Sequence, residues 1–190
     1  MKKNVNVKKL AALAMLVAMA YVVAALFRFS LVPAAPFLKY DPKDVIIAIG
    51  GFLFGPVEGA MIAAVVALLE MVTVSTTGWW GCAMNFISSA TFVVPAALLY
   101  RKHHTFKGAL LGLVIGACLT TGTMLLWNWL VVPIYQGTPR DAVADMLLPV
   151  FLPFNGAKSA INAVLTILVY KPVARALRHA RLVPRSEEKT

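Results

Sequence analysis

Residues 10–29 read LAALAMLVAMAYVVAALFRF, and the only charged side chain among them is that of Arg28. A helix that crosses the hydrocarbon core of a bilayer needs about 20 consecutive, mostly apolar residues. The stretch meets this requirement, whereas the surface helix of a soluble protein would carry a polar face. It therefore predicts a membrane-spanning helix near the start of the chain.

The same pattern recurs along the remaining sequence. Hydrophobic residues make up 60% of the 190 residues and charged residues 14%, against about 25% charged residues in a soluble domain. Apolar stretches predict five further spans, over residues 45–54, 57–74, 82–100, 108–135 and 150–170. We therefore expect an all-α, multi-pass protein of the cell membrane with six transmembrane helices. The expected organisation is a basic N-terminal segment over 1–9, a transmembrane domain over 10–175 and a basic tail over 176–190.

The second expected span is unusually short. Residues 45–54 reach only about 15 Å at a rise of 1.5 Å per residue, which is half the hydrocarbon thickness. Gly50 and Gly51 also weaken a helix at this point. Either the helix begins earlier, near Asp41, or it is a half-helix that faces a cavity, where irregular backbone is tolerated at membrane depth.

Basic residues gather on one side of the expected topology. Loops rich in Lys and Arg stay in the cytoplasm, so both termini are expected there. This bias accounts for most of the net charge of +10, and we expect a lipid bilayer and no nucleic acid as partner. The residues on this side are Lys2, Lys3, Lys8, Lys9, Arg101, Lys102, Lys107, Lys171, Arg175, Arg178, Arg181, Arg185 and Lys189.

A few polar residues lie at membrane depth, where they are costly and usually face a cavity or the bundle interior. We expect them to converge beneath the loop over residues 30–44. One interpretation is an outward-facing pocket for a small aromatic molecule with polar edges, in which Lys158 has no evident carboxylate partner. The other is interhelical hydrogen bonding together with an interfacial belt of aromatic residues. The polar residues are Glu70, Asn85, Asn128, Asn155, Lys158 and Asn162, and the aromatic residues are Trp79, Trp80, Trp127, Trp129, Phe37 and Tyr40.

Small residues at helical spacing allow two helix backbones to approach closely in lipid. Stripes of this kind, Gly59 with Ala63 and Ala67, and Gly108 with Gly112 and Gly116, predict packing within the chain. The stripe of Ala14 and Ala18 in the first span has two interpretations. It serves internal packing, or it docks another membrane protein.

Catalytic patterns are missing from the sequence. Gly156-Ala157-Lys158-Ser159 lacks the upstream glycine of a phosphate-binding loop. His103, His104 and His179 stand in basic segments without the ligand spacing of a zinc site. We therefore expect neither an enzyme nor a metal or cofactor site.

Five short stretches, in their order and spacing, resemble a known family. They are FLKYD at 37–41, GGFLFGP at 50–56, MNFI at 84–87, Asn128-Trp129, and Pro153-Phe154-Asn155 followed by Lys158. The chain resembles the riboflavin-binding S components of energy-coupling factor (ECF) vitamin transporters over about residues 10–175.

The resemblance implies a six-helix S component that captures riboflavin outside the cell as cargo. Its implied partners are one transmembrane coupling protein and two ATP-binding subunits. Asn128 and Lys158 would bond the polar edge of the ring, and Leu38 would cover the ring. The weaker candidates for contacts with ring or ribityl chain are Asn85 and Asn155, and Ala14 and Ala18 would contact the coupling protein.

Two alternatives remain open. The cargo could be another vitamin or precursor, such as pantothenate or a pyridoxine-like compound. In a different class, the chain could be a membrane-embedded enzyme or assembly factor, against which the lack of clustered catalytic residues argues.

Overall fold

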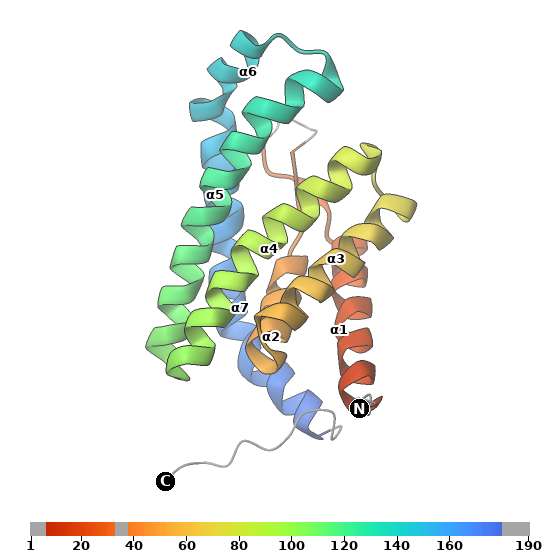
Figure 1. Ribbon diagram of the computed structural model, residues 1–190, viewed down its shortest axis with the longest axis vertical. Helices are drawn as coiled ribbons and strands as arrows, with labels where there is room; N and C mark the ends of the chain where they lie inside the picture. The colour runs from red at the N-terminus through yellow and green to blue at the C-terminus, as the bar shows by residue number, and fades with distance from the viewer. Residues whose placement is uncertain (1–6, 33–37, 180–190) are drawn as a thin grey trace, which may run out of the picture.

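The computed structural model describes residues 7–32 and 38–179 of the chain, which form a bundle of helices (Figure 1). Both α1 and α7 have their terminal ends at the lower end in Figure 1, and we call this the terminal end of the bundle. The elements in order are α1 (Val7–Leu26), β1 (Phe29–Ser30), β2 (Lys39–Tyr40), α2 (Lys43–Phe54), α3 (Pro56–Thr73), α4 (Gly78–His103), α5 (Phe106–Gln136), α6 (Arg140–Met146), the π-helical turn η1 (Leu147–Phe151) and α7 (Leu152–His179).

Five described segments are long and apolar enough to cross a membrane, namely α1, α3, α4, α5 and Arg140–Leu177. Five of the six expected spans are therefore confirmed as long apolar helices. The remaining one is α2, which has 12 residues and a length of about 18 Å. Six full crossings, and the placement of both termini in the cytoplasm, stay predictions.

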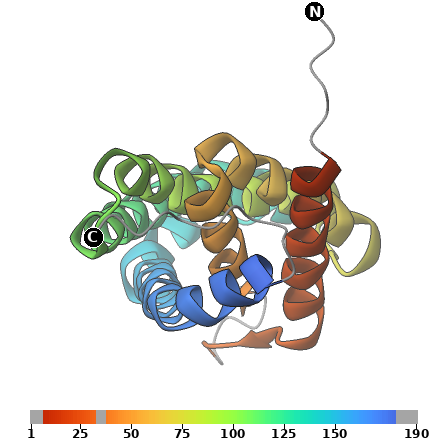
Figure 2. The same cartoon turned by 90° about the horizontal axis from the view of Figure 1, so that it is seen from below.

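Helix α2 lies in the middle of the bundle, as the view from below shows (Figure 2). It packs against α1, α3, α4 and α7, and its residues from Lys43 to Gly51 are buried. A helix surrounded by protein satisfies its ends within the protein and has no need to match the bilayer thickness. Of the two expectations, the earlier start is confirmed, because α2 begins at Lys43, close to Asp41, although the helix remains short.

Close backbone approaches hold α2 to α3 and α4 to α5. A Cβ atom on Gly59 of α3 would stand 3.0 Å from Cα of Gly51 in α2. A Cβ atom on Gly112 of α5 would stand 2.8 Å from the carbonyl oxygen of Ala96 in α4. Since a side chain at either site would force the helices apart, these glycine stripes pack within the chain, as predicted.

The connection over residues 136–148, between two of the expected spans, is mostly helical. After Gly137 the chain forms α6 and η1, which lead into α7 without a break. Pro149 and Pro153 lack the N–H that an α-helix would use at their positions. A wider π-turn at this point fits the missing donors, and such turns are frequent at functional sites.

The two-residue strands β1 and β2 pair antiparallel, with Phe29 opposite Tyr40 and Ser30 opposite Lys39. This small sheet links the end of α1 to the start of α2. It therefore fixes the described ends of the loop that was expected to cover a pocket. Part of that loop, residues 33–37 with Pro33, Pro36 and Phe37, lies outside the described residues.

Candidate functional site

A cavity of about 60 Å³ lies between the β2 segment and helices α4, α5 and α7. It is lined by residues from five separate parts of the chain, since Arg28 after α1 also contributes. All five residues predicted to contact a substrate are among them: Leu38, Asn85, Asn128, Asn155 and Lys158. The other lining residues are Arg28, Lys39, Asp41, Met84, Ser88, Met124 and Phe154.

The expected group of polar residues is therefore divided between two places. Asn85, Asn128, Asn155 and Lys158 line the cavity. Glu70 and Asn162 are not among the lining residues, and both are buried beside it. Their interactions, described below, belong to a network that supports the cavity from within the bundle.

Leu38 closes one side of the cavity and is only 8% exposed. It belongs to an apolar cluster with Val132 of α5, Val143 of α6 and Phe151 and Phe154. This packing attaches the end of the first loop to the helices across the cavity. The π-turn contributes directly, because Phe151 at its end is fully buried.

Asn128 and Asn155 are each held by a hydrogen bond to the backbone of their own helix. The Asn128 amide Nδ2 donates to the Met124 carbonyl at 2.7 Å, and the Asn155 Nδ2 donates to the Phe151 carbonyl at 2.8 Å. Both bonds run one turn back along the residue's own helix, so they fix the side-chain rotamer. Their Oδ1 atoms accept no hydrogen bond from the described residues, which leaves two oriented acceptors for a ligand N–H.

Lys158 has a carboxylate partner, contrary to the prediction. Its Nζ lies 3.5 Å from Oδ2 of Asp41, and its side chain is 12% exposed. Asp41 also pairs with Lys43, whose Nζ lies 3.4 Å from Oδ1. The sequence could not show the Lys158 pair, because Asp41 precedes α2 and Lys158 lies in α7.

Asp41 is ionised in this setting. Burial alone would raise the pKa of its carboxyl group, but the neighbouring cations Lys158, Lys43 and Arg28 outweigh burial. The pKa of Asp41 therefore lies below its usual value. A charged Asp41 keeps Lys158 at the cavity wall, where the ammonium group can donate to a ligand.

A buried polar network lies beside the cavity and connects α2 to three other helices. Lys43 donates to both carboxylate oxygens of Glu70 in α3, at 2.7 and 3.0 Å. Asp44 accepts hydrogen bonds from Ser89 of α4 and from Asn162 of α7, the latter at 3.3 Å. Charged groups at membrane depth need such partners, so this network determines where α2 begins.

Tyr40 attaches β2 to the same network. Its hydroxyl donates to Oδ1 of Asn162 at 3.0 Å. Burial, followed by the charges of Asp41 and Asp44, raises the pKa of Tyr40 to about 12. The phenol therefore stays protonated at neutral pH and remains a donor.

Arg28 and Lys39 also line the cavity, although neither was predicted to contact a substrate. The Arg28 Nη1 donates to the carbonyl of Val74 at 3.1 Å, which ties the end of α1 to the end of α3. The signal that could have identified Arg28 is its position as a single charged residue at the end of the apolar stretch over residues 10–29.

The tryptophans point elsewhere. Trp79, Trp80 and Trp129 are 74%, 44% and 39% exposed and do not line the cavity. For these three side chains the interfacial belt stays a prediction, whereas four of the six polar residues line the cavity. Phe37 lies outside the described residues.

Ala14 and Ala18 lie on the outer face of α1. Both are exposed, while Ala12, Leu16 and Ala20 on the opposite face are buried. Internal packing, one of the two interpretations of this stripe, is therefore wrong for these two residues. Docking of another protein on this face stays a prediction.

The comparisons with known proteins agree on one family. The model of the family "ECF transporter, substrate-specific component" matches residues 8–170. The riboflavin transporter RibU of Streptococcus thermophilus is 30% identical over 181 residues, which cover 90% of this chain and 85% of that protein. The riboflavin transporter FmnP of Bacillus subtilis is 28% identical over 189 residues, which cover 93% of this chain and 99% of that protein.

Solved structures give the same result for the fold. A chain described as the S component of a bacterial ECF transporter aligns with a TM-score of 0.76 and 29% sequence identity. The alignment covers 90% of this chain and 97% of the other. The family and the named relatives are transporters, which fits the expectation that this multi-pass membrane protein is not an enzyme. The chain belongs to the family of substrate-specific components of ECF transporters.

Proposed function

We propose that this chain is the riboflavin-capturing S component of an ECF importer and binds the vitamin in the cavity between β2, α4, α5 and α7. The observation that carries the proposal is the meeting of five predicted contact residues in one cavity. Its support from outside the chain is that the relatives named above are riboflavin transporters.

The chemistry of the cavity suits a flavin ring. The ring has one edge on which carbonyl acceptors alternate with an N–H donor. Lys158 can donate to a carbonyl oxygen, and the oriented oxygens of Asn128 and Asn155 can accept from an N–H. Leu38, Met84 and Met124 provide apolar contacts for the ring faces. Asn85, which is half-buried, can reach the ring or the ribityl chain.

The cavity has to widen when such a ligand binds. A volume of about 60 Å³ is well below the roughly 150 Å³ that suffices for benzene, and the flavin has three fused rings. The wall formed by Leu38 belongs to a short segment before a two-residue strand, whereas the other walls are long helices. We therefore assign the movement to the segment that carries Leu38.

Topology and partners complete the proposal. The basic residues near the terminal end support a cytoplasmic location for that end, and the cavity would then face the outer half of the bilayer. Ala14 and Ala18 form the contact for a transmembrane coupling protein, which works with two ATP-binding subunits. Uptake would then be driven by ATP hydrolysis in the partners.

Titration of the purified chain with riboflavin, followed by quenching of flavin fluorescence, tests the proposal. Wild-type protein should quench, and Lys158→Ala should weaken binding about tenfold or more, since a hydrogen bond to a charged group contributes about 1.5–3 kcal/mol. The variant should stay folded, because Asp41 keeps its pairing with Lys43.

Lys102→Ala is the matched control, because Lys102 is exposed in the last turn of α4 and does not line the cavity. It should bind riboflavin like the wild type. A wild-type chain that does not quench would refute riboflavin as cargo. Wild-type affinity in Lys158→Ala would refute the role of that residue.

A further inference from the structure

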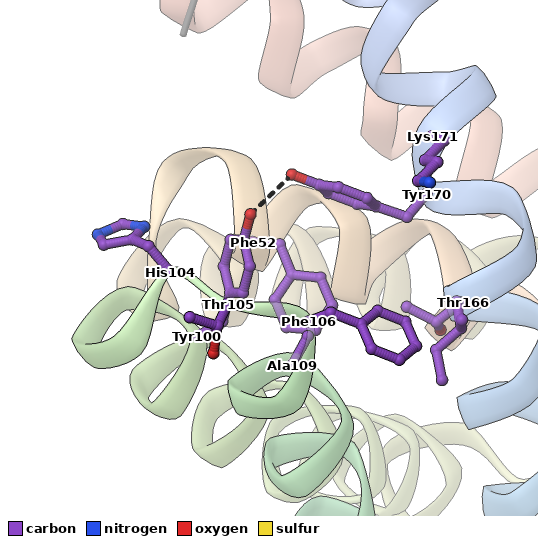
Figure 3. Close-up of a pocket in the computed structure, with 10 residues that line it drawn as sticks. Phe52, Tyr100, His104, Thr105, Phe106, Ala109, Thr166, Tyr170 and Lys171 are labelled. Carbon is purple, nitrogen blue, oxygen red and sulfur yellow. Dashed lines mark hydrogen bonds between the residues drawn. The ribbon is translucent and has the colours of Figure 1, made fainter. Parts of the chain in front are cut away.

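A second cavity, of about 180 Å³, lies near the terminal end of the bundle, far from the residues of the first. It is bounded by the end of α2, the turn between α4 and α5, and α7 (Figure 3). No residue lines both cavities. Nothing in the proposed capture of riboflavin uses this space, and we call it the terminal-end cavity.

The walls of the terminal-end cavity are aromatic and aliphatic. Phe52, Tyr100, Phe106 and Tyr170 contribute their rings, and Figure 3 shows the rings around the opening between the helices. Phe52 packs against Tyr100 with ring centroids 4.9 Å apart. The shape is therefore supported by ring packing.

The polar groups in these walls are already engaged within the protein. The hydroxyl groups of Tyr100 and Tyr170 bond each other at 3.1 Å. Thr166 donates to the Asn162 carbonyl at 2.6 Å, and the Thr105 hydroxyl accepts from the Gly108 N–H at 3.1 Å. A ligand with a polar edge would find few open partners here, whereas a hydrocarbon chain requires none. A volume above the roughly 150 Å³ that holds benzene accepts a segment of such a chain.

One lysine lies at the opening, together with a histidine. Lys171 and His104 line the cavity, and none of its ten described lining residues is acidic. His104 ends α4 in a left-handed conformation, with φ of 46°, which few residues other than Gly, Asn, Asp and His adopt. This conformation places its ring edge-on to Tyr100, 5.7 Å between centroids. Lys107, also exposed, follows Phe106 on the same turn.

We propose that the terminal-end cavity binds one anionic phospholipid, with an acyl chain between α2, α5 and α7 and the phosphate against Lys171 and His104. Basic pockets between transmembrane helices on the cytoplasmic side are suited to anionic headgroups. The apolar walls and the cationic rim match the two parts of such a lipid.

Native mass spectrometry of the purified full-length chain tests this directly. Dioleoylphosphatidylglycerol and dioleoylphosphatidylcholine are added at equal concentration, and the fraction of protein with one bound lipid is measured. We expect the phosphatidylglycerol adduct to exceed the phosphatidylcholine adduct at least threefold. Lys171→Gln should reduce the phosphatidylglycerol adduct about fivefold, the effect expected of one lysine near an anionic headgroup.

Two control variants separate the cavity from its surroundings. Lys102→Gln removes an exposed charge of the same end that does not line the cavity and should change the adduct less than twofold. Ala109→Phe fills the cavity, whereas Leu110→Phe changes the next residue of α5, which is 42% exposed and does not line it. Only the first of these two should lose the lipid. Thermal unfolding verifies that each variant is folded. If Ala109→Phe is not folded, the comparison of Lys171→Gln with Lys102→Gln alone tests the proposal.

Equal binding of both lipids would overturn the proposal, because an uncharged headgroup would then suffice. Equal losses in Lys171→Gln and Lys102→Gln would overturn it as well, since the charge of the whole surface would be responsible. Displacement of the lipid by saturating riboflavin would place the vitamin, not a lipid, in this cavity.

Discussion

Asp41 is shared by two lysines that have different exposures. Lys43 is 2% exposed and also pairs with Glu70, whereas Lys158 is 12% exposed and lines the proposed riboflavin cavity. Asp41 can therefore release Lys158 to a ligand and still keep one cation. We therefore infer that Lys43 stabilises the fold, whereas Lys158 is available to bind a ligand.

This division predicts a large stability effect at Lys43. Lys43→Met leaves Asp41 and Glu70 without the cation between them, and breaking a buried ion pair costs about 3–5 kcal/mol. We expect the free energy of unfolding in detergent, followed by circular dichroism, to fall by about that amount.

Lys9→Met is the matched control, because Lys9 pairs with Glu58 but its side chain is 42% exposed. Exposed pairs contribute about 0–1 kcal/mol, so this variant should unfold nearly like the wild type. The double variant Lys43→Met with Glu70→Leu should recover part of the stability, since an apolar pair of similar volume is often tolerated. Equal effects at Lys43 and Lys9 would contradict the assignment of Lys43 to the fold.

At the scale of elements, the short strand β2 and the residue before it join the first loop to the helices. Leu38 packs across the cavity against Val132, Phe151 and Phe154, while Tyr40 is bonded to Asn162 of α7. The apolar contact and the hydrogen bond lie two residues apart. Opening the apolar contact alone would admit a ligand without detaching α2.

Leu38→Asp should therefore accelerate the release of riboflavin. The charged side chain cannot remain in the apolar cluster, so the ring loses its cover, and changes in affinity usually appear in the dissociation rate. We expect the dissociation rate, measured by stopped-flow recovery of flavin fluorescence, to rise about tenfold or more.

Leu148→Asp makes the same substitution in η1 at a residue that is 72% exposed. It should leave the dissociation rate unchanged. If Leu38→Asp also releases riboflavin at the wild-type rate, the segment of Leu38 does not cover the ligand.

The elements and the site differ in how far the sequence predicts them. Long apolar runs predict the helices because hydrophobic length is a local property, and α1, α3, α4 and α5 lie close to the expected ranges. The short run over 45–54 also lies close to α2, Lys43–Phe54, but its burial could not be predicted in this way, since burial depends on four other helices. The helix over Arg140–Met146 was missed because it lies outside the apolar run.

For the site, single polar residues within apolar runs gave six candidates, of which Asn85, Asn128, Asn155 and Lys158 line the cavity and Glu70 and Asn162 do not. The ion pairs and hydrogen bonds of the buried network were not predictable, because they join distant segments. Lys43 and Glu70 are 27 residues apart, and Asp44 and Asn162 are 118 apart. Such pairs follow from the packing of helices, which no local pattern describes.

At the scale of the whole molecule, the outer faces of α1 and α5 expose side chains of different sizes. The outer face of α1 exposes the small side chains of Ala14 and Ala18 beside Met15 and Met19, while exposed residues of α5 such as Leu110 and Val114 are larger than alanine. Small residues allow close approach of a partner helix, and larger ones are typical of contact with lipid. The two faces should therefore respond differently to added bulk.

Ala14→Trp together with Ala18→Trp should abolish riboflavin uptake by cells. Both side chains point outward, so the bundle should fold, and the purified variant should bind riboflavin with nearly wild-type affinity. Uptake of labelled riboflavin and fluorescence titration, performed on the same variant, measure the two properties.

Leu110→Trp together with Val114→Trp is the matched control, because it adds the same side chains one turn apart on α5. It should preserve both uptake and binding. Uptake that persists in the α1 variant would refute docking on this face, and loss of binding would show that the variant disturbs the fold.

The burial of α2 has a consequence for how the chain is made. With 12 residues, α2 is too short to cross the bilayer alone, and Lys43 and Asp44 put two charges in its first turn. We therefore expect that α2 is not stable in lipid before its partner helices are present. Its partners on α7 include Asn162, which follows Asp44 by 118 residues, and Tyr170, whose ring packs against Phe52, so we expect α2 to reach its final place only after α7 has entered the membrane.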